Sequence, residues 1–194
     1  MTRRTDSELA EERELIRAAQ RDRAAFAPLY ERYVDQLFAY CYNLTQNREL
    51  AEDMTAATFA KAIEELPRFE WRGVPYSAWL YRVAANLVSR ERRRPGFAEL
   101  TDDHADSGVD PADAIVELSR DDEIRRAVAD LPADQRDVIL MRFGGELHNK
   151  EIGESMGRSE GAVKLLTFRA LTNLRKRLGA PLPADRPHNA RRPR

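Results

Sequence analysis

The sequence predicts an all-α protein in which two small helical domains are joined by a flexible acidic linker. Apolar residues recur at helical spacing over most of the chain, whereas β-branched runs with strand-like alternation are absent. Residues 95–113 contain Pro, Gly, Ser and six acidic side chains but no Lys or Arg, which is typical of a linker. The net charge is +1 over residues 1–94, −9 over residues 95–138 and +7 over residues 139–194, which also indicates two modules and a charged connector.

Four helices are expected before the linker, each with apolar residues at the helical period. Pro28 fits the second helix only in its first turn, and Pro67 ends the third. Residues 68–77 then form a loop rich in aromatic residues, with Gly73 and Pro75 as helix breakers. The expected helices span residues 8–20, 24–44, 49–66 and 78–93.

Helices resume after the linker at about residues 114–130. Pro132 is expected at the first position of the next helix, which ends at the Gly144–Gly145 pair. A helix-turn-helix follows, and Gly179 closes it. These elements place the domains at residues 9–94 and 114–179, with a disordered tail at residues 180–194.

The strongest functional pattern is the helix-turn-helix predicted over residues 149–178. Gly157 can take positive φ where the first helix ends, and Ser159 is a good N-cap for the second. Such a unit presents the start of its second helix to the DNA major groove. An ordinary αα-hairpin in a helical core is the alternative, but basic residues on or after the second helix favour DNA: Lys164, Arg169, Arg175, Lys176 and Arg177.

A second basic face is predicted on the helix at residues 78–93. Spacings of four, four and three place the following side chains on one side: Arg82, Asn86, Arg90 and Arg93. Arg suits phosphates or guanine edges, and Asn suits a base edge. Phe69, Trp71 and Tyr76 in the preceding loop are suited to stacking on an extruded base. In the alternative interpretation Trp79 and Phe69 are core anchors and the Arg row is a solvated face; Trp79 is assigned to the core.

Several function classes are not expected from this sequence. Cys41 is the single cysteine and is predicted to be a core residue, so no disulfide is expected within the chain. The three histidines fall in or near linker, loop and tail: His104, His148 and His188. No Gly-rich phosphate loop, metal-ligand cluster or catalytic set is found, so an enzyme, a cofactor and a small-molecule substrate are not expected. The N-terminus is polar and no apolar run is long enough to span a membrane, so a cytoplasmic protein is expected.

In order and spacing, these pieces together resemble a bacterial extracytoplasmic-function (ECF) RNA polymerase sigma factor, of the small type with only regions 2 and 4. The resemblance covers about residues 9–94 and 114–178. It is carried in region 2 by FAPLYERYVDQLFAYCYNLTQNRELAEDMTAATFAKA and WLYRVAANLVSRERRR, and in region 4 by LPADQRDVILMRF and EIGESMGRSEGAVKLLTFRALTNLRKRL. It implies that the protein binds RNA polymerase core and directs promoter-specific transcription initiation.

The resemblance also implies roles for residues in region 2. AEDMTAATF resembles the patch that docks on the clamp helices of the largest polymerase subunit, and the expected contacts are Glu52, Asp53 and Thr55. The family usually has Gln-Glu where this chain has Ala56-Ala57. The aromatic loop and the basic face resemble the element that captures an extruded −10 base and nucleates melting; the expected contacts are Trp71, Arg82, Asn86, Arg90 and Arg93.

In region 4, the second helix of the helix-turn-helix resembles the element that recognises the −35 sequence. The matching positions are Ser159, Glu160, Gly161, Lys164 and Arg169. Where the family commonly has Ser-Arg, this chain has Leu165-Leu166. Leu166 fits the buried face, whereas Leu165 is expected to point outward, toward either a thymine methyl or the polymerase flap. The acidic linker resembles the segment threaded through the RNA exit path, and a plain tether is its alternative.

Two further expectations concern partners. The resemblance implies an anti-sigma factor, often membrane-bound, which would hold the protein at the membrane without inserting it. The alternative function is a stand-alone helix-turn-helix regulator with residues 9–94 as an effector or dimerisation domain. That regulator would bind its operator stably without polymerase, whereas a sigma factor would bind DNA weakly alone and specifically with core enzyme.

Overall fold

The computed structural model describes residues 5–94 and 122–179, and every regular element within them is a helix. The elements are α1 (Asp6–Arg21), η1 (Arg23–Phe26), α2 (Ala27–Thr45), α3 (Arg48–Glu65), η2 (Leu66–Arg68), α4 (Tyr76–Glu91), α6 (Asp122–Ala129), α7 (Ala133–Ile139), η3 (Leu140–Gly144), α8 (Asn149–Met156) and α9 (Glu160–Arg177). The predicted all-α fold is confirmed. The predicted linker, the first residues of the helix expected at 114–130 and the predicted tail lie outside the described residues.

Local capping explains where the N-terminal helices begin and end. Thr5 and Glu8 form a capping box at the start of α1. The Asn47 side chain accepts a hydrogen bond from the Leu50 N–H (2.9 Å) and so begins α3. Gln46 takes a left-handed conformation (φ 53°) and separates α2 from α3.

Several helix boundaries differ from the sequence prediction. The fourth helix begins at Tyr76 instead of residue 78, because Pro75 is its N-cap and the Pro75 carbonyl accepts from the Ala78 N–H (3.0 Å). Pro132 is likewise the N-cap of α7 and not its first residue. The helix expected to run on to Gly144 changes after Ile139 into the π-helical turn η3.

The helix-turn-helix forms from α8 and α9 as predicted. Gly157 has φ +64° at the end of α8, and the Ser159 hydroxyl accepts from the Ala162 N–H (3.2 Å) at the start of α9. Gly153 allows the turn to approach α8 closely, since a Cβ placed there would lie 2.7 Å from the Arg158 carbonyl oxygen. The turn therefore requires glycine at two positions, Gly153 and Gly157.

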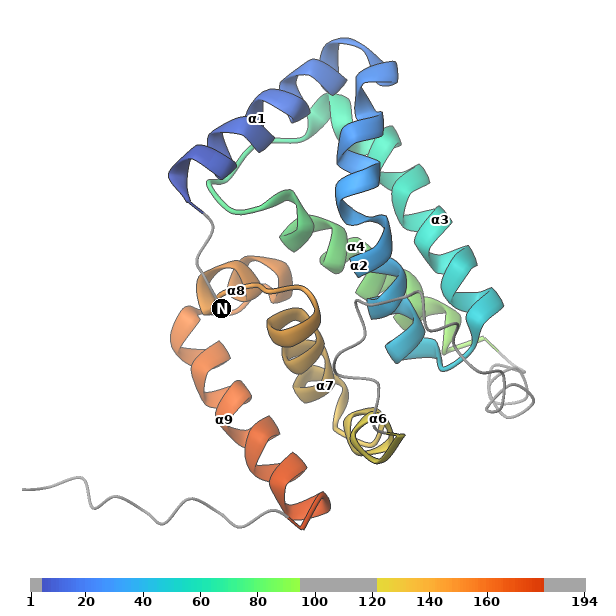
Figure 1. The fold of residues 1–194 in the computed structure, drawn as a ribbon, viewed down its shortest axis with the longest axis vertical. Helices are drawn as coiled ribbons and strands as arrows, with labels where there is room; N and C mark the ends of the chain where they lie inside the picture. The colour runs from blue at the N-terminus through green and yellow to red at the C-terminus, as the bar shows by residue number, and fades with distance from the viewer. Residues whose placement is uncertain (1–4, 95–121, 180–194) are drawn as a thin grey trace, which may run out of the picture.

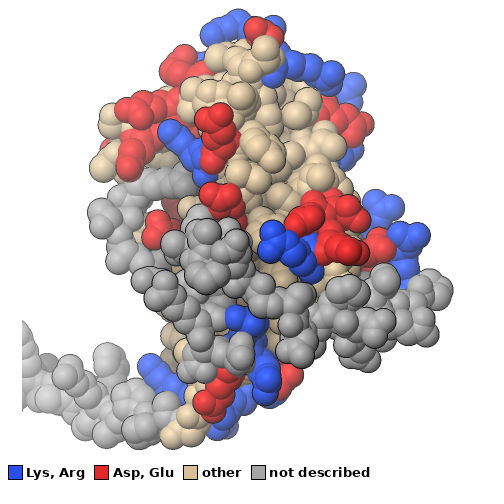
Figure 2. Space-filling view, turned by 45° about the vertical axis from the view of Figure 1, so that its right-hand side comes forward, with Lys and Arg blue, Asp and Glu red and all other residues tan. Residues whose placement is uncertain are grey.

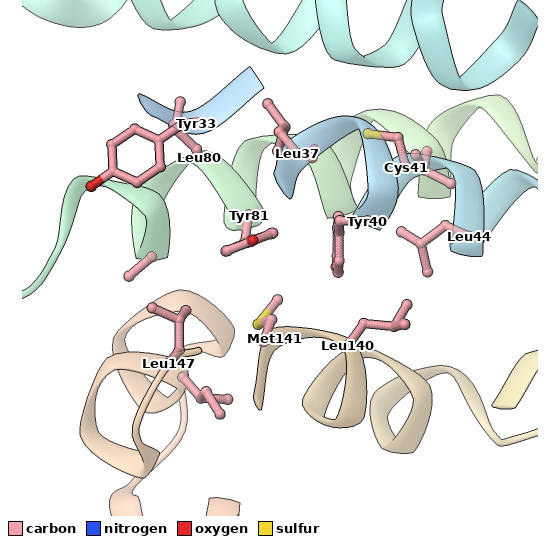
Figure 3. Close-up of a cluster of buried hydrophobic side chains, with 14 of the residues drawn as sticks. Tyr33, Leu37, Tyr40, Cys41, Leu44, Leu80, Tyr81, Leu140, Met141 and Leu147 are labelled. Carbon is pink, nitrogen blue, oxygen red and sulfur yellow. The ribbon is translucent and has the colours of Figure 1, made fainter. Parts of the chain in front are cut away.

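The helices on either side of the predicted linker share one hydrophobic core. Figure 1 shows α8 lying beside α4, with α9 on the outer side, and η3 and α6 contact α2. In Figure 3, Tyr40 and Tyr81 project from α2 and α4 toward Leu140 and Met141, and all four side chains are buried. Gly145 accommodates Tyr81, whose ring atoms would lie within 2.8 Å of an added Cβ. The two predicted modules are thus packed together.

Candidate nucleic-acid and polymerase interfaces

The start of α9 presents every residue predicted to recognise the −35 sequence. The exposed positions are Ser159, Glu160, Gly161, Lys164 and Arg169. Val163, Ala170 and Leu174 of the same helix are buried, so the two sets lie on opposite faces. In Figure 1, α9 lies on the far side of α7 from α2 and α3.

Lys164 and Glu160 form an ion pair on this face. The Nζ–Oε1 distance is 2.8 Å, and the hydrogen bond from Lys164 lowers the pKa of Glu160. Both side chains are more than half exposed, and such surface pairs contribute little stability. Lys164 can therefore exchange its carboxylate partner for a DNA phosphate at small cost.

The side chains predicted to form a basic row on α4 differ in exposure in this structure. Asn86, Arg90 and Arg93 are exposed, but Arg82 is partly buried against α8. The Arg82 guanidinium donates hydrogen bonds to the carbonyl oxygens of Ser155 (3.1 Å) and Glu154. Arg82 thus satisfies the last carbonyls of α8, a role that its spacing along α4 could not reveal.

The aromatic residues of the loop also separate. Phe69, Tyr76 and Trp79 form one cluster, with ring centroids 4.9 to 5.5 Å apart. Tyr76 is fully buried, so the expectation that it is available to a base is wrong. Trp71 lies apart from this cluster, beside α1. Trp79, assigned to the core from sequence, is only partly buried.

A hollow of about 390 Å³ lies beside this aromatic cluster. Phe69 and Trp79 line it together with four basic and three acidic side chains: Lys61, Arg68, Arg72, Arg82, Glu64, Glu65 and Glu70. Aromatic and cationic groups around a hollow of this kind can hold a nucleobase and its phosphate. Glu154 of α8 also lines the hollow and lies 3.8 Å from the Arg72 guanidinium, so α8 occupies one side of it.

Helix α1 fixes both ends of the aromatic loop, which sequence reasoning missed. The Gln20 amide donates to the carbonyl oxygens of Leu66 (3.0 Å) and Phe69 (2.9 Å). At the other end, the fully buried Glu12 carboxylate accepts from the Tyr76 N–H (3.1 Å) and also from the Tyr33 hydroxyl. The sequence contains one sign of this role. Glu12 lies four residues before Ile16, so an acidic side chain falls on the apolar face of α1.

The predicted polymerase contacts on α3 do not all face solvent. Glu52 and Asp53 are exposed, and Glu52 pairs with Arg48 one turn away (3.0 Å). Thr55 is buried, and its hydroxyl donates to the Ala51 carbonyl (2.7 Å). The structure therefore removes Thr55 from the exposed patch and leaves the two carboxylates. In Figure 2, acidic and basic side chains are interspersed over the upper part of the face shown.

Charged side chains of α7 and of the end of α4 are also withdrawn from solvent: Arg136 is buried, and Asp137 and Arg92 are partly buried. Burial raises the pKa of Asp137 to about 6, although Arg136 and Arg92 both act to lower it. Burial lowers the pKa of Arg92, whose guanidinium donates to the Leu44 carbonyl at the end of α2.

Cys41 is fully buried as predicted, and burial raises the pKa of its thiol to about 12. A group suited to hold a metal ion is not found among residues 5–94 and 122–179. In the same residues no helix is long and apolar enough to cross a membrane.

Comparison with known families identifies two matching segments. Residues 29–96 match the model of Sigma-70 region 2, and residues 127–176 match the model of Sigma-70, region 4. Two solved structures have similar folds. CnrH in complex with the cytosolic domain of CnrY has a TM-score of 0.63 at 22% identity, covering 87% of this chain and 97% of that one. RpoE from Bartonella quintana, in complex with the anti-sigma factor NepR, has a TM-score of 0.64 at 23% identity, covering 83% and 98%.

Relatives of similar sequence extend over most of the chain. The ECF RNA polymerase sigma factor BldN of Streptomyces coelicolor is 33% identical over 180 residues, which cover 89% of this chain and 68% of the relative. The ECF RNA polymerase sigma factor SigW of Bacillus subtilis is 32% identical over 171 residues, which cover 81% and 90%. Similarity of this extent, with regions 2 and 4 in order, shows that the chain belongs to the ECF family of RNA polymerase sigma factors, which direct transcription initiation.

Proposed function

We propose that this sigma factor recognises the −35 element with the start of α9 and the −10 element with α4 and the aromatic loop, and that it nucleates promoter melting. The observation that carries the proposal is the exposed polar and basic start of α9 in an intact helix-turn-helix. Ser159, Glu160 and Gly161 lie where such a helix meets base edges, and Lys164 and Arg169 lie where it meets phosphates.

The hollow beside Trp79 is our proposed site for an extruded −10 base. Stacking on an aromatic ring offsets part of the free energy that the base loses on leaving the duplex. Asn86 and Arg90 are exposed on α4, and Arg93 is exposed just after α4 ends at Glu91; all three would hold the melted strand. Because α8 covers Arg82 and lines one side of the hollow, −10 recognition would require α8 to move away from α4.

The proposed partners follow from the same surfaces. Glu52 and Asp53 would contact the clamp helices of the largest polymerase subunit, and α9 would lie near the flap. The similar structure RpoE was solved in complex with the anti-sigma factor NepR, which supports an anti-sigma partner for this chain. The protein would act in the cytoplasm as an initiation factor, with RNA synthesis carried out by the polymerase.

DNA binding with and without core polymerase tests this proposal. Fluorescence anisotropy of a labelled promoter duplex should show weak, salt-sensitive binding by the protein alone. Adding core enzyme should give tight binding that competitor DNA of unrelated sequence does not displace. Equally tight, sequence-specific binding without core would instead identify a stand-alone regulator.

A further inference from the structure

The outward face of α9 carries two large apolar side chains that the interior of the protein does not use. Leu165 is 51% exposed and Phe168 is 65% exposed. Spacings of four and three residues place them in line with Gly161, opposite the buried Val163 and Ala170. Exposed apolar side chains grouped on one helix face indicate an interaction surface.

Basic side chains flank this apolar strip of Leu165 and Phe168. A helix of 3.6 residues per turn places Lys164 on one side of the strip and Arg169 on the other. Both basic residues are exposed. Lys164 is paired with Glu160 in this structure, and exchange of that carboxylate for a phosphate frees its charge for DNA. The strip is then bordered by basic groups on both sides and is complementary to a major groove, where bases lie between two phosphate backbones. Charge complementarity therefore favours duplex DNA as the occupant of this face over an apolar protein segment.

The major groove offers such a strip one apolar group, the C5-methyl of thymine. We propose that Leu165, with Phe168 beside it, contacts a thymine methyl and so makes thymine the preferred base at one position of the −35 element. This inference rests on the proposed function and extends it, because it assigns the specificity of one base to one side chain. Gly161 has no side chain in line with the strip, which lets the helix start approach the base edges.

Deoxyuridine tests the inference, because it pairs like thymine but lacks the methyl group. A promoter is first selected with this sigma factor and core polymerase, and each −35 thymine is then replaced singly. Binding of the holoenzyme should fall about three- to fivefold at one position, as expected for the loss of one buried methyl contact. Leu165→Ala should bind the thymine promoter more weakly and lose the difference between thymine and deoxyuridine.

Two matched variants separate a methyl contact from a general loss. Leu165→Met keeps an apolar contact and should keep most of the difference. Lys164→Ala removes a phosphate contact and should weaken both promoters by the same factor. Circular dichroism should show unchanged thermal unfolding for Leu165→Ala, because this side chain is exposed.

The outcomes are distinct. If no deoxyuridine position affects the wild-type holoenzyme, or if Leu165→Ala retains the full difference, the assignment of Leu165 is wrong while promoter recognition stands. If Leu165→Ala weakens binding of core polymerase itself, the strip contacts a protein and the proposal is also wrong. Failure of the proposed function would appear earlier, as the absence of any selected promoter.

Discussion

Gly153 determines how closely α8 and the turn of the helix-turn-helix can approach. A Cβ at this position would lie 2.7 Å from the Arg158 carbonyl oxygen, and this atom belongs to the backbone. We expect Gly153→Ala to lower the free energy of unfolding by about 1–3 kcal/mol, because the turn must shift. Urea unfolding followed by circular dichroism measures this change.

Gly161→Ala provides the control for that substitution. A Cβ at Gly161 meets no atom within 4 Å, and the position is helical. The control should raise stability by about 0.5–1 kcal/mol, because Ala loses less backbone entropy than Gly in a helix. Equal effects of the two substitutions would contradict the role assigned to Gly153.

The sequence predicted the exposure of single side chains better than it predicted their hydrogen-bond partners within the protein. Helical periodicity placed Leu165 outward and Cys41 inward, and both are confirmed. It also placed Arg82 on a basic face, but the acceptors of its hydrogen bonds lie 72 and 73 residues further along the chain. Periodicity describes which face a side chain occupies and contains no information on the element that packs against that face.

At the scale of elements, α1 positions the loop that we propose for −10 recognition. Gln20 donates to the carbonyl oxygens of Leu66 and Phe69, and Glu12 accepts from the N–H of Tyr76. Existence of α1 was predicted, but its attachment to a loop some 50 residues away was not. Polar residues on an amphipathic helix give no sign of which of them will meet a distant backbone.

We predict that Gln20→Ala frees the start of this loop. The loss of two hydrogen bonds to partly buried carbonyls should cost about 1–3 kcal/mol, because the acceptors lose their partner. Hydrogen exchange by mass spectrometry should show faster exchange confined to the peptide covering residues 66–76. Arg17→Ala on the exposed side of α1 is the control, and equal exchange in both variants would contradict the role of Gln20.

At the scale of the whole molecule, the main feature is the core shared by the helices before and after residues 95–121. Tyr40, Tyr81 and Met141 are buried at this contact, and the Tyr40 and Tyr81 rings lie 4.8 Å apart. The sequence predicted the helices and the charge boundary but not their packing. The apolar face of a helix must be buried, but the sequence pattern of that face does not specify which domain supplies the helix that packs on it.

Asp137, at the same contact, makes stability depend on pH. Its pKa is about 6 in the folded protein against an ordinary value of 3.8, so the folded state binds a proton more readily than the unfolded state. Protonation of Asp137 therefore adds to the free energy of unfolding as pH falls from about 6 toward 4. This added stability is lost as pH rises through 6. We expect Asp137→Asn to raise stability at pH 7.5 by on the order of 1–3 kcal/mol and to flatten this dependence.

Urea unfolding of wild type and Asp137→Asn at pH 5 and pH 7.5 measures this difference. The relevant quantity is the gap between the two proteins, which should be larger at pH 7.5. Asp53→Asn, which changes an exposed carboxylate on α3, is the control. If the difference in free energy of unfolding between the two proteins is the same at both pH values, the charge of Asp137 does not affect how the helices before and after residues 95–121 pack together.

Run-off transcription with purified core polymerase and a promoter library measures whether this protein directs initiation. Promoter-specific transcripts are expected when the protein is added. Lys164→Ala should lower their dependence on the −35 element while core binding is kept, and Asn86→Ala should change the preferred −10 sequence. If the added protein produces no promoter-specific transcript, it does not act as a sigma factor.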